Sequence, residues 1–239
     1  MYEYKSRIRY SEINSLGKLS LSALVNYFQD CSIFHSEDID AGLEYYKKQN
    51  IFWALNSWQI IVHEYPKMGE IVTVGTAPYD FKGFIGYRNF WMKNEKGDIL
   101  ACANSIWSLI HTNTYKPVSL TEDIIKKYQI SEKMDMDYAD RHIKMKNNPS
   151  DMTELVIKPH NIDTNLHVNN SQYIQIGLDY LNLEEREHIR QLRAEYKLQA
   201  FLGDTLYPKR YEYDNCIGIS LQNDSGKSYC NMEFALESR

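Results

Sequence analysis

The sequence lacks the defining features of several large protein classes. No uninterrupted apolar run approaches the roughly 18 residues needed to cross a bilayer. The formal net charge is -5, so the basic excess typical of nucleic-acid-binding proteins is missing. The four cysteines are widely scattered, and neither they nor the histidines have the spacing of metal ligands. These absences predict a protein with no membrane span, no nucleic-acid partner, no metal and no other cofactor.

What is present is the composition of a globular protein. Of the 239 residues, 43% are hydrophobic and 25% are charged, and the 19 tyrosines favour strand-rich structure. Residues 1–10 alternate charged with apolar or small residues and contain no apolar core of a signal peptide. We therefore expect a cytoplasmic protein whose thiols are reduced.

Hydrophobic periodicity divides the first half into a strand, a helix and a series of strands. Residues 2–10 alternate as in a half-buried strand, and apolar residues recur at helical spacing from Leu21 to Cys31, with Ser20 as the predicted N-cap. Later strands are predicted at Phe52–His63, Glu70–Ala77, Ile85–Lys93 and Leu100–His111.

The second half repeats this order. A strand at Leu155–Lys158 precedes a helix at Asn170–Leu181, and local matches such as Asp163 against Asn14, at an offset of 163 − 14 = 149, indicate a duplication. We predict an α+β fold, with one helix packed on a largely antiparallel sheet in each half. The remaining strands are predicted at Gln191–Ala200, Thr205–Tyr213, Ile217–Gln222 and Tyr229–Leu236.

The predicted domains are residues 1–117 and 153–239, joined by a linker at 118–152. The linker includes a polar stretch without strand alternation, preceded by a short helical segment that Thr121 or Ser119 caps. In the second domain, Gly177 lies in the middle of the predicted helix. It is either a tolerated helix glycine or a point where helix and sheet approach closely.

The segment Asn161–Asn170 carries the strongest chemical signal. Asp163, Asn165 and His167 occupy alternate positions just before the second helix, so in extended chain their side chains would converge. Backbone N–H groups near Val168–Asn170, at the helix start, are candidates to stabilise an oxyanion, and Val168 and Asn169 are the two selected. The competing interpretation is a polar loop in which Asn169 or Asn170 caps the helix.

This duplicated pattern, with its D-x-N-x-H-V-N-N motif, resembles the acyl-acyl carrier protein thioesterases, and specifically their bacterial members. Those are tandem hot-dog proteins, in which each unit is an antiparallel sheet wrapped around one long helix. The resemblance covers nearly the whole chain, including segments 10–13, 26–30, 65–70, 105–107, 163–173 and 195–197.

The resemblance implies hydrolysis of fatty acyl-acyl carrier protein to free fatty acid and holo-acyl carrier protein, in fatty acid biosynthesis. It implies that the first domain binds the acyl chain and that the second is catalytic, with Asp163, Asn165 and His167 matching the family's catalytic residues. Asp163 is then the general base or the nucleophile. Asn165 positions the carbonyl or the water. His167 orients the water or the Asp163 carboxylate, or exchanges a proton with it.

Two adjacent positions depart from family patterns. Gln199 stands where the family usually has a glutamate, and the next residue is Ala200 where plant members have a cysteine. This excludes a cysteine nucleophile there and leaves Gln199 as a substrate-positioning candidate or a surface strand residue.

The alternatives left open are an acyl-CoA thioesterase and a non-catalytic protein that binds acyl chains or acyl carrier protein. The implied partner is acyl carrier protein bearing a phosphopantetheine-linked acyl chain, and a homodimer stays open. Because the carrier protein is acidic in the family, we expect this chain to bind it through a basic surface. The candidates are Arg190, Arg193, Lys197, Lys209 and Arg210.

Overall fold

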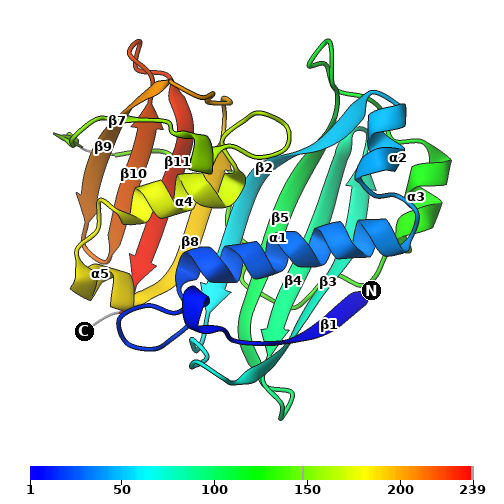
Figure 1. The fold of residues 1–239 in the computed structure, drawn as a ribbon, viewed down its shortest axis with the longest axis horizontal. Helices are drawn as coiled ribbons and strands as arrows, with labels where there is room; N and C mark the ends of the chain where they lie inside the picture. Colours follow the sequence, from blue (N-terminus) through cyan, green and yellow to red (C-terminus); the bar gives the residue numbers. More distant parts are fainter. Residues whose placement is uncertain (147, 238–239) are drawn as a thin grey trace. The chain divides into compact units, whose positions relative to one another are not determined.

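The computed structural model describes residues 1–146 and 148–237 and divides the chain into two compact units. Unit 1 comprises Met1–Asn56 and Val62–Tyr138, and unit 2 comprises Ser57–Ile61 together with the residues from Ala139 onward. Each unit has a helix packed against an antiparallel sheet, which confirms the predicted α+β class (Figure 1).

The sheet of unit 1 has the strand order β1-β3-β4-β5-β2, and the pairs β1–β3, β3–β4 and β4–β5 are antiparallel. Gly75 lies opposite Trp91 in this sheet, and a Cβ at Gly75 would lie 2.2 Å from the indole ring. The indole therefore requires glycine at this position. The strands are β1 (Tyr2–Arg7), β2 (Ile51–Val62), β3 (Ile71–Lys82), β4 (Ile85–Lys93) and β5 (Ile99–His111).

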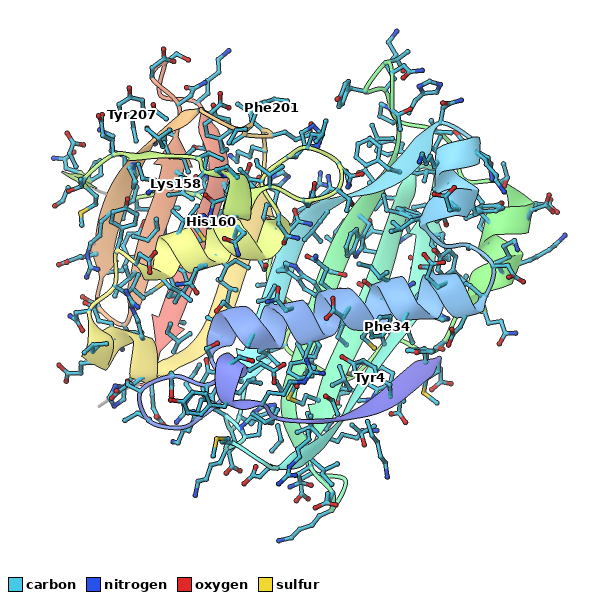
Figure 2. All side chains as sticks on the ribbon, in the orientation of Figure 1. Tyr4, Phe34, Lys158, His160, Phe201 and Tyr207 are labelled. Atoms are coloured by element: carbon cyan, nitrogen blue, oxygen red, sulfur yellow. The ribbon has the colours of Figure 1, made fainter. Side chains whose placement is uncertain are left out.

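The long helix α1 (Leu21–Asp38) lies across this sheet (Figure 1). It begins as predicted, because the Ser20 hydroxyl accepts a hydrogen bond from the N–H of Ala23 at 3.2 Å. Its buried face includes Leu24 and Phe28, and burying each such side chain stabilises the fold by about 2 kcal/mol. On its outer side, Phe34 packs edge-on against Tyr4 of β1 (Figure 2).

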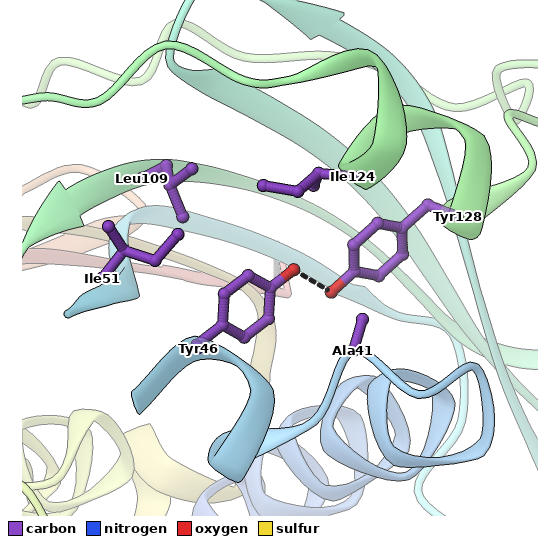
Figure 3. Close-up of a cluster of buried hydrophobic side chains, with 6 residues drawn as sticks. All are labelled: Ala41, Tyr46, Ile51, Leu109, Ile124 and Tyr128. Carbon is purple, nitrogen blue, oxygen red and sulfur yellow. Dashed lines mark hydrogen bonds between the residues drawn. The ribbon is translucent and has the colours of Figure 1, made fainter. Parts of the chain in front are cut away.

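Two short helices close one end of unit 1. They are α2 (Leu43–Lys48), which the sequence pattern did not reveal, and α3 (Glu122–Tyr128), which Thr121 caps as predicted. Between them the hydroxyls of Tyr46 and Tyr128 are hydrogen-bonded at 2.9 Å (Figure 3). The surrounding apolar cluster consists of Ala41, Tyr46, Ile51, Leu109, Ile124 and Tyr128.

In unit 2 the strand order is β8-β11-β10-β9-β6, and residues Ser57–Ile61 of β2 pair with β8. The helix α4 (Asn170–Leu178) packs on β10 and β11, where a Cβ on Gly177 would lie 2.6 Å from the Met232 methyl. Gly177 is thus a point of close approach between helix and sheet. The remaining elements are β6 (Ser150–Asp151), β7 (Leu155–Val156), α5 (Leu183–Glu187), β8 (Ile189–Tyr196), β9 (Thr205–Tyr213), β10 (Cys216–Gln222) and β11 (Ser228–Leu236).

Strand β8 ends at Tyr196, whereas the sequence pattern extended it to Ala200. The N–H groups of Lys197 and Leu198 both donate to the carbonyl of Tyr229, at 2.8 and 3.2 Å, so the regular ladder ends there. Residues 197–200 consequently leave the sheet as an irregular segment that leads to the candidate site.

The segment 118–152, which the sequence pattern assigned to a linker, is divided between the two units. In unit 1 the Asn89 side chain accepts hydrogen bonds from the Met134 N–H and the Tyr138 hydroxyl, both at 3.0 Å. In unit 2 the buried Glu195 carboxylate accepts from the N–H of Ile143 at 3.1 Å and contacts His142 at 2.8 Å. The buried side chains of Asn89 and Glu195 therefore hold residues 134–143 of this segment in place.

Candidate active site

The predicted catalytic residues lie on a tight turn, so the expectation of extended chain is wrong. The Asp163 N–H donates to the His167 carbonyl at 2.8 Å, and Ile162 and Val168 form an antiparallel bridge. Leu166 closes the turn with a φ of 64°, in the left-handed region. Asp163 and His167 therefore come together as opposite residues across a turn rather than by strand alternation.

The Asp163 side chain holds this turn. Its Oδ1 accepts the N–H of Asn165 at 2.8 Å and that of His167 at 3.4 Å. Such an Asx turn is a common use of aspartate. The other carboxylate oxygen, Oδ2, accepts no hydrogen bond from the described residues. Asn165 is exposed at the tip of the turn, so the structure brings Asp163 and His167 together and leaves Asn165 apart.

His167 is half-buried against Phe201, with the two ring centroids 5.0 Å apart (Phe201 is labelled in Figure 2). Burial lowers the pKa of His167, although the nearby Asp163 carboxylate opposes that shift. The imidazole is therefore neutral at pH 7 and can accept a proton. The sequence motif did not reveal Phe201, because it lies 34 positions further along the chain (201 − 167 = 34).

The two backbone groups predicted to stabilise an oxyanion are already occupied, which corrects that prediction. The Val168 N–H donates to the Ala200 carbonyl at 3.0 Å, and the Asn169 N–H donates to the Asn161 carbonyl at 2.9 Å. Asn169 instead caps α4, through its side chain and the N–H of Ser171. The N–H of Asn170, the first residue of α4, has no acceptor in the described part of the chain.

Gln199 lies near this turn because its neighbour Ala200 is hydrogen-bonded to Val168, which follows the turn, and to Tyr173 of α4. The Ala200 carbonyl accepts from Val168, and its N–H donates to the Tyr173 hydroxyl at 2.9 Å. Gln199 itself is partly exposed. The sequence showed Tyr173 only as an apolar helix position, and burial raises the pKa of its phenol.

The other residues singled out from the sequence are His160 and the basic residues considered for partner binding. His160 is exposed on the short helix η2 (Pro159–Asn161; Figure 2). Each of the basic residues considered for binding an acidic partner forms an ion pair with an acidic side chain of the same chain. The pairs are Arg190–Glu237, Arg193–Glu233, Lys197–Glu195, Lys209–Asp151 and Arg210–Glu185.

The described residues contain no cluster of three or more side chains suited to a metal. Over the same residues, no helix is long and apolar enough to span a membrane. The groups at the candidate site are the Asp163 carboxylate, the neutral His167 imidazole and the start of α4.

Two family models match the chain. The acyl-ACP thioesterase N-terminal domain matches residues 1–128, and the C-terminal domain of the same family matches residues 143–237. The fold and the site define a tandem hot-dog protein with a carboxylate–imidazole turn ahead of helix α4. The chain belongs to the acyl-ACP thioesterase family.

Known structures and sequences agree with this assignment. An acyl-ACP thioesterase from Bacteroides thetaiotaomicron has a TM-score of 0.90 and 26% identity, with coverage of 98% of this chain and 97% of that one. The 12:0-ACP thioesterase of Umbellularia californica shares the fold, with a TM-score of 0.85, 18% identity and coverage of 100% and 97%.

The curated relatives are longer than this chain. A chloroplastic acyl-[acyl-carrier-protein] hydrolase of Cuphea viscosissima is 25% identical over 83% of this chain and 51% of its own length. A chloroplastic palmitoyl-acyl carrier protein thioesterase of Arabidopsis thaliana is 26% identical over 80% and 50%. The chain therefore spans about half the length of the curated relatives it matches.

Proposed function

We propose that this protein hydrolyses the thioester between a fatty acyl chain and the phosphopantetheine arm of acyl carrier protein. The observation that carries the proposal is the turn that pairs Asp163 with His167 at the start of α4, in a chain of this family. Nucleophilic attack on an acyl carbonyl requires a base and a donor for the oxyanion. A carboxylate, a neutral imidazole and a helix N-terminus can supply these.

In the proposed reaction Asp163 acts as general base. Its Oδ1 is held by backbone N–H groups, so Oδ2 takes a proton from water while the water oxygen bonds to the thioester carbon. The tetrahedral intermediate then expels the thiolate, which takes the proton back from Asp163, directly or through His167, and the products are a free fatty acid and holo-acyl carrier protein.

The neighbouring groups have supporting roles in this proposal. Neutral His167 accepts a hydrogen bond from the attacking water or passes a proton to the leaving sulfur. Of the N–H groups from Val168 to Asn170, that of Asn170 is the oxyanion donor, because it has no acceptor in the described part of the chain. Asn165 and Gln199 each offer an amide to the substrate, and unit 1 receives the acyl tail.

The test is a hydrolysis panel of acyl carrier protein thioesters of graded chain length, each matched by the acyl-CoA of the same chain. We expect faster release of fatty acid from the carrier protein substrates. Faster turnover of the acyl-CoA series would favour an acyl-CoA thioesterase instead. Stoichiometric binding of acyl carrier protein without release of product would favour a binding protein. This outcome is worth testing because Gln199 stands in place of a carboxylate.

A further inference from the structure

Arg88 is a positive charge in the interior of unit 1. It lies on β4 and is only 8% exposed. Its Nη1 contacts Nδ1 of His35 at 3.0 Å and the Thr76 hydroxyl at 3.3 Å. The guanidinium carbon lies 5.3 Å from the centre of the Tyr128 ring. Arg88 is therefore enclosed by α1, β3 and α3 within a single unit.

No carboxylate of the described residues forms an ion pair with Arg88, unlike two partly buried arginines of unit 2. Arg210 and Arg193, for comparison, each contact a glutamate. The neighbours of Arg88 carry no negative charge, since burial and Arg88 itself lower the pKa of His35 to about 3 and burial raises that of Cys31 to about 12. A buried charge without a counter-ion is costly unless polar groups surround it.

Arg88 also has hydrogen-bonding capacity that the protein does not use. A guanidinium has five N–H donors, and among the described residues only Nη1 has acceptors. Hydroxyls cluster beside it, where Tyr128 bonds to both Tyr46 and Ser36 at 2.9 Å (Figure 3 shows the tyrosine pair). The interior of unit 1 thus offers donors that match an oxygen atom on a ligand.

We propose that Arg88 determines substrate specificity by binding an oxygen atom carried on the acyl chain far from the thioester. The inference rests on the proposed function, in which unit 1 receives the acyl tail. If an acyl chain that ends in a methyl group reached Arg88, it would remove polar surroundings from the guanidinium and form no hydrogen bond with it. A chain ending in a hydroxyl would return one, and sites built to bind a hydroxyl discriminate strongly against analogues that lack it.

The test compares pairs of acyl carrier protein thioesters of equal length, one plain and one with a hydroxyl on the terminal carbon. The pairs are graded in length, because the depth of Arg88 along the acyl path is what the series locates. We expect the wild-type protein to prefer the hydroxylated member by about 10-fold or more in kcat/KM at the length that reaches Arg88. Shorter pairs are expected to show a ratio near one.

Arg88→Met removes the charge and keeps an unbranched side chain, so the preference should disappear and plain long chains should become better substrates. Arg7→Met is the control, since Arg7 is an exposed arginine of the same unit, and it should keep the wild-type ratio. Thermal unfolding of each variant checks that it is folded.

Two results would overturn this inference and leave the proposed function intact. One is equal hydrolysis of plain and hydroxylated chains by the wild-type protein at every length, which needs no variant. The other is a folded Arg88→Met protein with the wild-type ratio. Absence of hydrolysis of every substrate would overturn the proposed function and this inference with it.

Discussion

The turn at residues 14–18 in unit 1 and the turn at 163–167 in unit 2 have the same backbone and different side chains. The Asn14 N–H donates to the Lys18 carbonyl at 2.8 Å, as Asp163 does to His167. In both turns the side-chain oxygen of the first residue accepts the N–H groups two and four positions later. Both turns precede a capped helix, α1 or α4.

This comparison separates the structural role of the turn from its chemical role. The turn needs an acceptor at its first position, and the amide of Asn14 supplies that as well as the carboxylate of Asp163 does. The turn does not need a negative charge or an imidazole. The capping interpretation and the catalytic interpretation are therefore compatible, and the two can be separated by substitution.

The largest expected effect comes from Asp163→Asn, which gives the second turn the first residue of the first turn. Because Asn14 holds the same backbone, we expect an unchanged melting temperature together with a loss of about 10²- to 10⁴-fold in kcat/KM. Thermal unfolding and hydrolysis of acyl carrier protein thioesters measure the two quantities. Asn14→Asp is the matched control, with activity unchanged. Substantial turnover in Asp163→Asn would rule out the proposed base.

A smaller loss is expected for His167→Gln, about 10²-fold in kcat/KM. Burial lowers the pKa of His167 below its ordinary value near 6.5, so the wild-type rate should be constant near neutral pH and fall only as the solution is acidified through that lowered pKa. If His167 titrates in this way, the acid limb should change in the variant. An identical pH profile in both proteins would contradict the assignment.

The buried histidine of unit 1, His35, should affect stability. Its pKa is lowered to about 3, mainly by burial, so the unfolded chain binds a proton that the folded chain does not between about pH 6.5 and pH 3. Stability from this group is present above that window and is lost as pH falls. Relative to His35→Gln, wild type should lose about 2 kcal/mol of unfolding free energy between pH 7 and pH 5. Urea unfolding at both pH values measures this, and equal losses would count against a buried neutral imidazole.

The smallest effect concerns the residue that closes each turn. Gly17 has a φ of 71° in the first turn, whereas Leu166 has 64° in the second. Since a side chain in this region is strained, Leu166→Gly should raise the unfolding free energy by about 0.5 kcal/mol and Gly17→Leu should lower it by about 1 kcal/mol. Changes of the same sign in calorimetry would show that the two turns are not equivalent.

Much of the fold could be predicted because it depends on local signals. The N-caps Ser20, Thr121 and Asn169 are each visible in sequence, and each accepts a backbone hydrogen bond as expected. Strand β4 matches its predicted range Ile85–Lys93. These elements follow from side-chain period and capping chemistry, which nearby residues determine.

The candidate site was predicted less completely, because its geometry depends on contacts between distant residues. The left-handed backbone at Leu166 has no glycine to signal it, so the segment read as extended chain. Two contacts join residues more than 30 positions apart (200 − 168 = 32). They are the hydrogen bond from the Val168 N–H to the Ala200 carbonyl and the packing of Phe201 on His167. Spacing in the motif carries no information about such partners.

Strand β2 has a consequence for attempts to divide the protein. Residues up to Asn56 belong to unit 1, but Ser57–Ile61 pair with β8 and belong to unit 2. A fragment that starts at Ala139 would leave out these residues and leave one edge of β8 with open backbone hydrogen-bonding groups, which favours aggregation. Unit 2 is therefore discontinuous in sequence, and it should be expressed together with residues Ser57–Ile61 of β2.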